Sequence, residues 1–318
     1  GSTDGSSVVI DNYARKDRRI RVIRNKKNVF IAEARNRALE QAEGEYLYLI
    51  DSDDWVLPDM LETMYMRAKR HNAQYVVAGY FMDYFVDGIN KSYAVCPDDR
   101  DYDQKEFREN AIRYLTRTIL TVPWNKLYSI PYLREHNIKF RNTKLEDHHF
   151  NMDILMDVER VSMISKPFYH YYRSRQGTDS ELVYNKFLNQ KKRDHIAHTL
   201  EVYKHWGIQD ANTMGQSADY HMGRLVQCVT QIVANKQLTK EEKYKELQTI
   251  IDDPYTTFAK NNALNASKKI AILSIPIRMK NEKMCYLMGW MIAKFKEKFA
   301  GTYYTMRASV AQGASYVE

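Results

Sequence analysis

The fold is decided by the stretch Tyr46-Leu47-Tyr48-Leu49-Ile50-Asp51-Ser52-Asp53-Asp54-Trp55, in which five apolar residues run directly into a segment with three aspartates. A short, continuous apolar run predicts a buried strand. Helical patterns lie on either side of it, at residues 32–42 and 58–71, and a second apolar run covers residues 74–80. Strands that alternate with helices are typical of a parallel α/β sheet, which binds ligands at the carboxyl ends of its strands. We therefore expect an α/β sheet with the aspartates at its ligand-binding edge.

The pattern changes near residue 180. The first part adds an extended run at residues 20–23, helical patterns at 104–120 and 147–156, and strand-like runs at 161–164 and 168–173. The second part consists of long helical patterns at residues 184–206, 219–235, 239–251 and 281–299. We predict an α/β domain over residues 1–180 and a mainly helical domain over residues 181–318.

The composition is that of a folded protein with a basic surface. Of the 318 residues, 44% are hydrophobic and 28% charged, which excludes disorder and collagen. The excess of 48 Lys and Arg over 40 Asp and Glu gives +8, which suits nucleic acid, a phosphorylated small molecule or an anionic membrane. The three cysteines are too far apart in sequence for a metal knuckle. No apolar run reaches the roughly 18 residues that a membrane span needs.

The three aspartates have two interpretations. Carboxylates at the carboxyl end of a strand can hold a hard divalent cation against phosphate oxygens. Aspartates are also favoured at helix N-caps, and a helix is expected to begin at Pro58. The preceding apolar strand favours the ligand site.

The order of the motifs resembles the inverting glycosyltransferases of family 2, which have the nucleotide-diphospho-sugar transferase fold called GT-A. The resemblance covers roughly the first 180 residues and is specific in order and spacing. It is carried by Gly1-Ser2-Thr3-Asp4-Gly5-Ser6, Arg21-Val22-Ile23, Ala34-Arg35-Asn36-Arg37-Ala38-Leu39, Gly44-Glu45-Tyr46, Asp51-Ser52-Asp53-Asp54-Trp55, Asn125-Lys126-Leu127-Tyr128, Glu146-Asp147 and Tyr172-Arg173. It implies an α/β architecture with an open mixed sheet flanked by helices, followed here by a mainly helical C-terminal region.

The resemblance implies a donor site around the aspartates. Asp51 and Asp53 match the residues that hold Mn²⁺ or Mg²⁺ against the donor diphosphate, with Asp53 the more direct ligand. Arg35 and Asn36 match residues that contact the donor. The alternative for these two is a solvated helix face and an asparagine that packs helices.

It also implies an acceptor side. Asp147 matches the general base that deprotonates the acceptor hydroxyl, and Glu146 and Trp124 are expected near the acceptor or sugar. Acids also stabilise helix N-termini, and Trp124 is equally consistent with a buried core residue. The neighbouring His148 and His149 point about 100° apart on a helix, which places them poorly for sharing one metal ion.

Arg173 and Arg175 follow an aromatic strand and lie in a basic segment. In the family this segment often closes over the diphosphate, and arginine forks suit phosphate oxygens. The alternative is a pair of solvated charges.

Two features lie outside the shared core. Family members begin with an apolar strand that contacts the nucleoside base, and this strand is expected to be missing upstream of Gly1. Within residues 281–299, apolar residues recur at helical spacing beside five lysines. Such a helix can lie in an anionic membrane interface or pack in a core. The apolar residues are Met284, Leu287, Met288, Met291, Ile292 and Phe295, and the lysines are Lys280, Lys283, Lys294, Lys296 and Lys298.

Together these implications predict a metal-dependent, inverting transferase that moves a sugar from a UDP-sugar to a hydroxyl of a glycan or lipid-linked acceptor. The expected setting is surface polysaccharide synthesis in the cytoplasm, peripherally at the inner face of the cell membrane. The absence of a Gln-x-x-Arg-Trp signature favours single addition over polymerisation. A nucleotidyltransferase or a non-catalytic basic binding module are the alternatives. No nucleic-acid partner is expected, because no nucleic-acid-binding motif is present.

Overall fold

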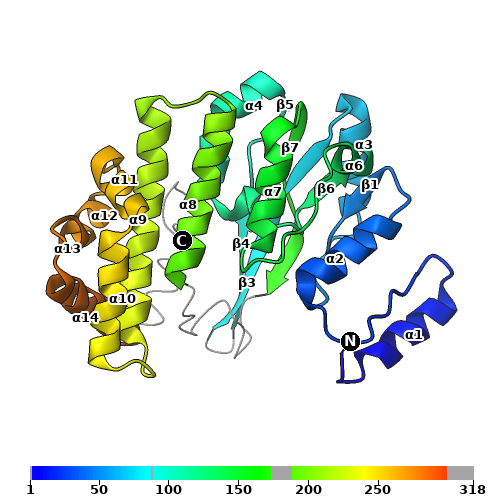
Figure 1. The fold of residues 1–318 in the computed structure, drawn as a ribbon. Helices are drawn as coiled ribbons and strands as arrows, with labels where there is room; N and C mark the ends of the chain where they lie inside the picture. The colour runs from blue at the N-terminus through cyan, green and yellow to red at the C-terminus, as the bar shows by residue number, and fades with distance from the viewer. Residues whose placement is uncertain (1, 87–88, 173–187, 299–318) are drawn as a thin grey trace.

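A computed structural model describes residues 2–86, 89–172 and 188–298 of the chain (Figure 1). Its centre is a mixed, seven-stranded sheet in the order β1-β6-β3-β7-β2, with β4 paired to β3 and β5 to β7. Among the described strands, β3 and β7 pair in parallel and every other pairing is antiparallel, so the parallel pairing expected from the alternation of strands and helices was wrong for most of the sheet. The strands are β1 (Tyr46–Tyr48), β2 (Trp55–Val56), β3 (Tyr75–Val86), β4 (Ile89–Val95), β5 (Arg100–Asp103), β6 (Lys126–Ser129) and β7 (Arg160–Tyr172). The predicted open mixed sheet flanked by helices is confirmed.

Strand β3 is buried because its side chains alternate between two cores. Tyr75 and Val77 belong to the core that includes α7, whereas Val76 and Ala78 pack against α3 on the opposite face. Successive side chains of a strand point to opposite faces, so an unbroken apolar run here reflects a strand covered on both sides.

Strand β7 was predicted as two strands, at residues 161–164 and 168–173. The structure instead contains one strand, whose register with β3 shifts at Gly79, the partner of Pro167. A Cβ on Gly79 would lie 2.6 Å from Cys96 Sγ and 3.1 Å from the Pro167 Cα. Proline is tolerated within a sheet at such an irregularity, and only glycine allows the backbones to approach this closely.

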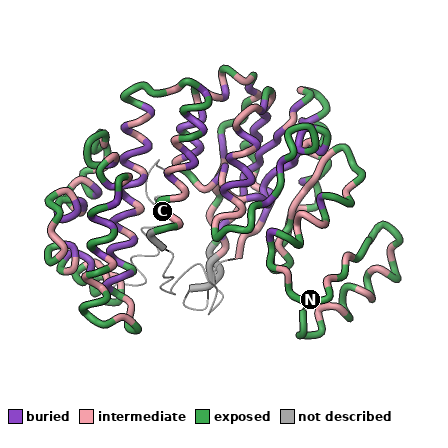
Figure 2. The backbone as a smooth tube through the Cα atoms, viewed as in Figure 1, coloured by how far each residue is buried: buried purple, intermediate pink, exposed green. Residues whose placement is uncertain are grey.

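The helices of the first half flank this sheet, except α1, which lies apart from it at one end of the molecule (Figure 1). They are α1 (Ser6–Lys16), α2 (Phe30–Gln41), α3 (Met60–His71), α4 (Gln104–Asn110), α5 (Ile112–Leu115), the 3₁₀ helix η1 (Thr118–Leu120), α6 (Ile130–Glu135) and α7 (Glu146–Asp157). The single helix predicted over residues 104–120 is thus divided into three short ones. Helix α1 buries no residue, as Figure 2 shows.

The prediction of a strand at residues 20–23 was wrong. These residues form an irregular segment in which Ile20 is 39% and Val22 36% exposed. A strand requires a partner for its backbone groups, and no strand in the described part of the chain pairs with this segment.

Within residues 188–298 the C-terminal part is helical, as predicted. It contains α8 (Leu188–His205), α9 (Ala211–Ala234), α10 (Lys240–Asp252), α11 (Pro254–Asn262), α12 (Lys268–Leu273), α13 (Ile275–Arg278) and α14 (Glu282–Lys298). Val202, Tyr203 and Trp206, at the end of α8 and just after it, pack in the core of the first half, while α9 to α14 form a second core. The division at residue 180 stays a prediction. No helix among the described residues has the length and apolar content that a membrane crossing requires.

Candidate active site

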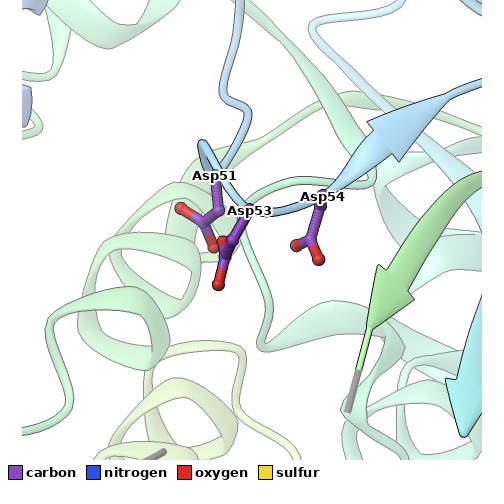
Figure 3. A group of neighbouring side chains, drawn as sticks. All are labelled: Asp51, Asp53 and Asp54. Atoms are coloured by element: carbon purple, nitrogen blue, oxygen red, sulfur yellow. The ribbon is translucent and has the colours of Figure 1, made fainter. Parts of the chain in front are cut away.

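The aspartate segment forms a tight turn between β1 and β2. The Asp54 amide donates a hydrogen bond to the Asp51 carbonyl at 3.2 Å, which closes the turn. Figure 3 shows the Asp51 and Asp53 carboxylates beside each other and Asp54 at the start of β2. One carboxylate oxygen from each of the three residues lies within 4.8 Å of the other two. Three converging carboxylates fit a hard divalent cation such as Mg²⁺ or Mn²⁺, which prefers oxygen ligands.

Strand β7 holds this turn in place through Tyr169. The Tyr169 hydroxyl donates to Asp54 Oδ2 at 2.6 Å and accepts from the Asp51 amide at 3.3 Å. The Tyr172 amide donates to Asp54 Oδ1 at 3.1 Å. Burial raises the pKa of Asp54 and exceeds the opposing effect of these hydrogen bonds. Both oxygens of Asp54 are therefore anchored to the sheet, which orients the acidic turn.

Arg35 connects the acidic turn to Asp147. It lies in α2, its side chain is 11% exposed, and its Nη2 donates to Asp51 Oδ1 at 3.0 Å. Its Nη1 donates to Asp147 Oδ1. The guanidinium also lies 5.2 Å from the centre of the Phe140 ring, a distance that permits a cation–π contact. One arginine thus brings together carboxylates from two distant segments of the chain.

Asp147 lies in the first turn of α7. Leu145 occupies the N-cap position and makes no side-chain capping bond, and the hydrogen-bonding partner of the Asp147 carboxylate is Arg35. Burial raises the pKa of Asp147 to about 6, against the lowering effect of Arg35 and with smaller contributions from Glu146 and Asp51. A carboxylate with such a pKa is ionised at neutral pH and is more basic than an ordinary aspartate.

Asn36 lies next to Arg35 in sequence and has a different environment. Its amide nitrogen donates to the Phe140 carbonyl at 2.8 Å, and its amide oxygen accepts from the Phe140 amide at 2.8 Å. Asn36 therefore fixes the backbone of the residue whose ring supports Arg35.

Trp124 is 4% exposed and surrounded by aromatic rings. It stacks on Tyr169 with ring centres 4.3 Å apart, and Tyr80 and Tyr171 contact it as well. These are the contacts of a core residue. Trp124 packs against the ring of Tyr169, whose hydroxyl holds the acidic turn.

The segment before β6 is organised by a fully buried lysine. Lys126 Nζ donates to the Ile119 carbonyl at 2.7 Å, to Asn125 Oδ1 at 2.6 Å and to the Val122 carbonyl. Burial lowers the pKa of Lys126 well below its usual value. The Asn125-Lys126 pair thus holds the loop that carries Trp124.

The other sequence predictions fall into two groups. Glu146 is half-buried beside Asp147, whereas Arg173 and Arg175 lie outside the described residues. Sequence reasoning counted Asp54 in the aspartate run but assigned the metal ion to Asp51 and Asp53, and it missed Tyr169 as the residue that holds the acidic turn. Asp54 carries a visible signal as the third aspartate of the run, but nothing local marks Tyr169.

His148 and His149 contact different histidines of α8. The His148 ring stacks on His195 with centres 4.0 Å apart, and His149 Nδ1 lies 2.8 Å from His198 Nδ1. Burial lowers the pKa of both His148 and His195 well below the usual value, and nearby basic groups lower them further. These rings are therefore neutral at pH 7.

Comparison with solved structures identifies the fold. A crystal structure of residues 1–349 of Staphylococcus aureus TarS, in complex with UDP-GlcNAc, superimposes with a TM-score of 0.63 at 19% sequence identity. The match covers 92% of this chain and 80% of that one. The mixed sheet and its flanking helices have the GT-A fold.

Sequence comparison identifies a family domain in the first part of the chain. Residues 1–135 match the family model for glycosyl transferase family 2, so the chain carries a domain of this family. A cholesterol galactosyltransferase of Borreliella burgdorferi is 28% identical over 189 residues, 58% of this chain and 52% of the relative. Glycosyltransferase GlyA of Streptococcus pneumoniae is 28% identical over 262 residues, 78% of this chain and 35% of the relative. The chain thus spans between about a third and about a half of the length of these two relatives.

Proposed function

We propose that this protein transfers a sugar from a nucleotide-diphospho-sugar, specifically a UDP-sugar, to a hydroxyl of a glycan or lipid-linked acceptor, with inversion at the anomeric carbon. The observation that carries the proposal is the bridge that Arg35 makes between Asp51 and Asp147. It places three carboxylates suited to a metal ion on one side of a guanidinium and one weakly acidic carboxyl on the other. The structural similarity to TarS solved with UDP-GlcNAc and with UDP supports the donor class.

The acidic turn is proposed as the donor-diphosphate site. Asp51, Asp53 and Asp54 would hold Mn²⁺ or Mg²⁺, with Asp53 the exposed member of the set. When bound, the ion supplies Lewis-acid stabilisation of the negative charge on the leaving nucleoside diphosphate. Tyr169 contributes by keeping Asp54 in one orientation, which lowers the reorganisation needed when donor and ion bind.

Asp147 is proposed as the general base. Inverting transfer is a single displacement, so the acceptor hydroxyl attacks the anomeric carbon from the face opposite the leaving group. The Asp147 carboxylate takes the hydroxyl proton as the new glycosidic bond forms and the bond to the diphosphate breaks. Burial raises the pKa of Asp147, and Arg35 opposes this effect. Arg35 therefore favours the ionised form of Asp147 before the acceptor binds.

The remaining assignments rest on the resemblance and on proximity. Glu146 is proposed to contact the acceptor, and Arg173 and Arg175 the donor diphosphate. Trp124 is proposed to act through Tyr169, given its burial. We place the reaction in surface polysaccharide synthesis at the cytoplasmic face of the membrane, a setting that rests on the family resemblance. The name of the relative TarS, poly(ribitol-phosphate) beta-N-acetylglucosaminyltransferase, also describes transfer to a polymer.

The first test is donor binding, measured as thermal unfolding with UDP, GDP, CDP or TDP, each with and without Mn²⁺. A ligand at about 100 times its dissociation constant adds roughly 2.7 kcal/mol of stability. We expect a Mn²⁺-dependent shift with UDP that Asp53→Asn abolishes. The matched control is Asp59→Asn, which removes a nearby carboxylate whose exposed pair with Lys166 contributes little.

The second test is turnover, measured as UDP release in the presence of acceptor, with the anomeric configuration of the product determined by NMR. Asp147→Asn should lower turnover by about 10²- to 10⁴-fold while leaving the UDP-dependent thermal shift intact. Near-native turnover of this variant would refute the base assignment, and a retained anomeric configuration would refute inversion. The absence of a thermal shift with every nucleotide would favour a non-catalytic module.

A further inference from the structure

Helices α12, α13 and α14 carry an unusual number of exposed apolar side chains. Ile272 is 65%, Met279 60% and Met291 58% exposed. The set is Ile272 on α12, Ile275 on α13, Met279 just after it, and Met284, Leu287, Trp290 and Met291 on α14. Helix α13 contacts both α12 and α14, so these residues belong to one continuous part of the fold. Figure 1 shows the three helices together at the end of the molecule opposite α1. We call this set the α12–α14 surface.

On α14 the apolar residues form two separate faces. Cys285, Met288 and Gly289 face the second core, where a Cβ on Gly289 would lie 2.9 Å from a Val233 methyl group. Met284, Leu287 and Met291 are spaced by three and four residues, which puts them on one exposed face. The core interpretation of this helix therefore accounts for one face and leaves the other unexplained.

The same surface is strongly basic. Residues 268–298 contain eight Lys and Arg but only two Asp and Glu. Lys268, Lys269, Lys280 and Lys283 are exposed and form no ion pair with any residue in the described ranges. The charge is therefore available to a partner.

The combination of lysine, methionine and an exposed tryptophan distinguishes between kinds of partner. Lysine is depleted at protein–protein interfaces. Helices that lie in a membrane interface combine Lys or Arg with Leu, Phe and Trp, and are attracted to anionic lipids. Trp290 is 48% exposed, and tryptophan prefers the headgroup level of a bilayer.

A second basic segment provides a comparison. Residues 15–27 contain eight basic residues and one acidic residue. Three of its arginines form ion pairs, Arg19 with Asp17, Arg21 with Glu43 and Arg24 with Asp11. This segment also follows a helix with exposed apolar residues, so it is the appropriate control for a basic and partly apolar surface elsewhere on the molecule.

We infer that the α12–α14 surface docks onto the surface of an anionic phospholipid bilayer, with its apolar side chains in the interface and its lysines at the headgroups. The helices lie on the membrane and do not cross it. This inference does not depend on glycosyl transfer, because lipid binding can be measured without donor or acceptor.

The test is flotation of the full chain with two kinds of vesicle, one of phosphatidylcholine alone and one in which about a third of the lipid is phosphatidylglycerol. We expect the protein to float with the anionic vesicles only, and less so at high salt. Leu287→Gln/Met291→Gln and Lys280→Gln/Lys283→Gln should each weaken binding by about 10- to 30-fold. All four residues are exposed, so the variants should fold, and an unchanged thermal unfolding midpoint checks this.

Lys26→Gln/Lys27→Gln is the matched control, since it removes the same charge from the other basic segment. It should bind like the unmodified protein. Tryptophan fluorescence gives a local readout, because vesicle binding should shift the emission to the blue and Trp290→Phe should remove that shift.

Three results would overturn the inference. They are failure of the unmodified protein to bind anionic vesicles, equal binding by the Leu287→Gln/Met291→Gln variant, and loss of binding in the Lys26→Gln/Lys27→Gln control alone. A concentration-dependent dimer that Leu287→Gln/Met291→Gln abolishes, without vesicle binding, would assign the surface to a second copy of the chain.

Discussion

The hydroxyl of Tyr169 lies 2.6 Å from Oδ2 of Asp54 and donates a hydrogen bond to it. The same hydroxyl accepts from the Asp51 amide, so a single oxygen on β7 holds both ends of the acidic turn. Burial raises the pKa of Tyr169 strongly, which keeps the hydroxyl protonated and able to donate. The geometry of the proposed metal site therefore depends on a strand more than 100 residues away in sequence.

Tyr169→Phe should weaken Mn²⁺-dependent UDP binding by about 10- to 100-fold, the usual effect of losing a residue that orients a metal ligand. Isothermal titration with UDP and Mn²⁺ measures this. Tyr203→Phe is the matched control, because the Tyr203 hydroxyl is buried without a hydrogen-bond partner among the described residues. Equal affinity of the two variants would show that Tyr169 does not orient the site.

Transfer activity should depend on pH through Asp147. The base acts as a carboxylate, so kcat/KM should rise with pH to a plateau, with a midpoint near the Asp147 pKa of about 6. Arg35→Gln should move this midpoint to higher pH, because burial raises the pKa and Arg35 opposes that effect. Arg35→Lys keeps the positive charge, so its midpoint should lie between those of Arg35→Gln and the unmodified protein. A midpoint that does not move in Arg35→Gln would contradict the proposed pairing.

The buried histidines should make the protein sensitive to acid. The folded-state pKa of His148 is lowered by burial and then by His198, and that of His221 falls to about 3 through burial and then Lys192. The unfolded state binds protons first, so the stability from keeping these rings neutral is present above pH ~6.5 and is lost as the pH falls toward the folded-state values. Each ring that stays neutral in the folded state lowers the free energy of unfolding by roughly 1.4 kcal/mol per pH unit below ~6.5.

His148→Leu should therefore move the midpoint of acid unfolding to lower pH, followed by circular dichroism. The choice of His148 rests on its burial, with both ring nitrogens lacking a hydrogen-bond partner within the described ranges. His136→Leu removes an exposed histidine and should leave the midpoint unchanged. An equal effect of both substitutions would rule out the buried cluster as the cause.

Lys126 should contribute strongly to stability. Lys126→Met removes the ammonium donor from the Ile119 and Val122 carbonyls and from Asn125, leaving buried acceptors unsatisfied. We expect a loss of about 2–4 kcal/mol in the free energy of unfolding, measured with urea. Lys139→Met breaks only the exposed pair with Glu40 and should cost less than ~1 kcal/mol. Similar losses in the two variants would disprove a special role for Lys126.

Local pattern was sufficient for much of the architecture. The apolar run before Asp51 predicted β1, and periodicity placed α3, α7 and the long C-terminal helices, because side-chain spacing reports which face an element buries. The aspartate run also identified the acidic turn, since the residues involved are adjacent in sequence. The family resemblance predicted the mixed sheet for the same reason, through short motifs in a recognisable order.

Local sequence pattern could not predict which distant segments pair as strands. Residues 20–23 have strand-like composition but no strand beside them, whereas β4 and β5 have weak patterns and form strands through β3 and β7. Residues 161–173 were predicted as two strands, but β7 continues through Pro167, which lies opposite Gly79 on the neighbouring strand. Backbone hydrogen bonds in a sheet are made with another segment, so a segment's own residues do not determine whether they form.

The candidate site shows the same difference between what local sequence determines and what tertiary structure determines. Residue type and order determined which carboxylates are candidates for metal binding and proton transfer. Only the tertiary structure decided that Arg35 joins Asp51 to Asp147, that Asn36 holds the Phe140 backbone and that Tyr169 orients Asp54. A side chain's charge is local information, whereas its pKa and its partner depend on burial and on groups brought together by folding.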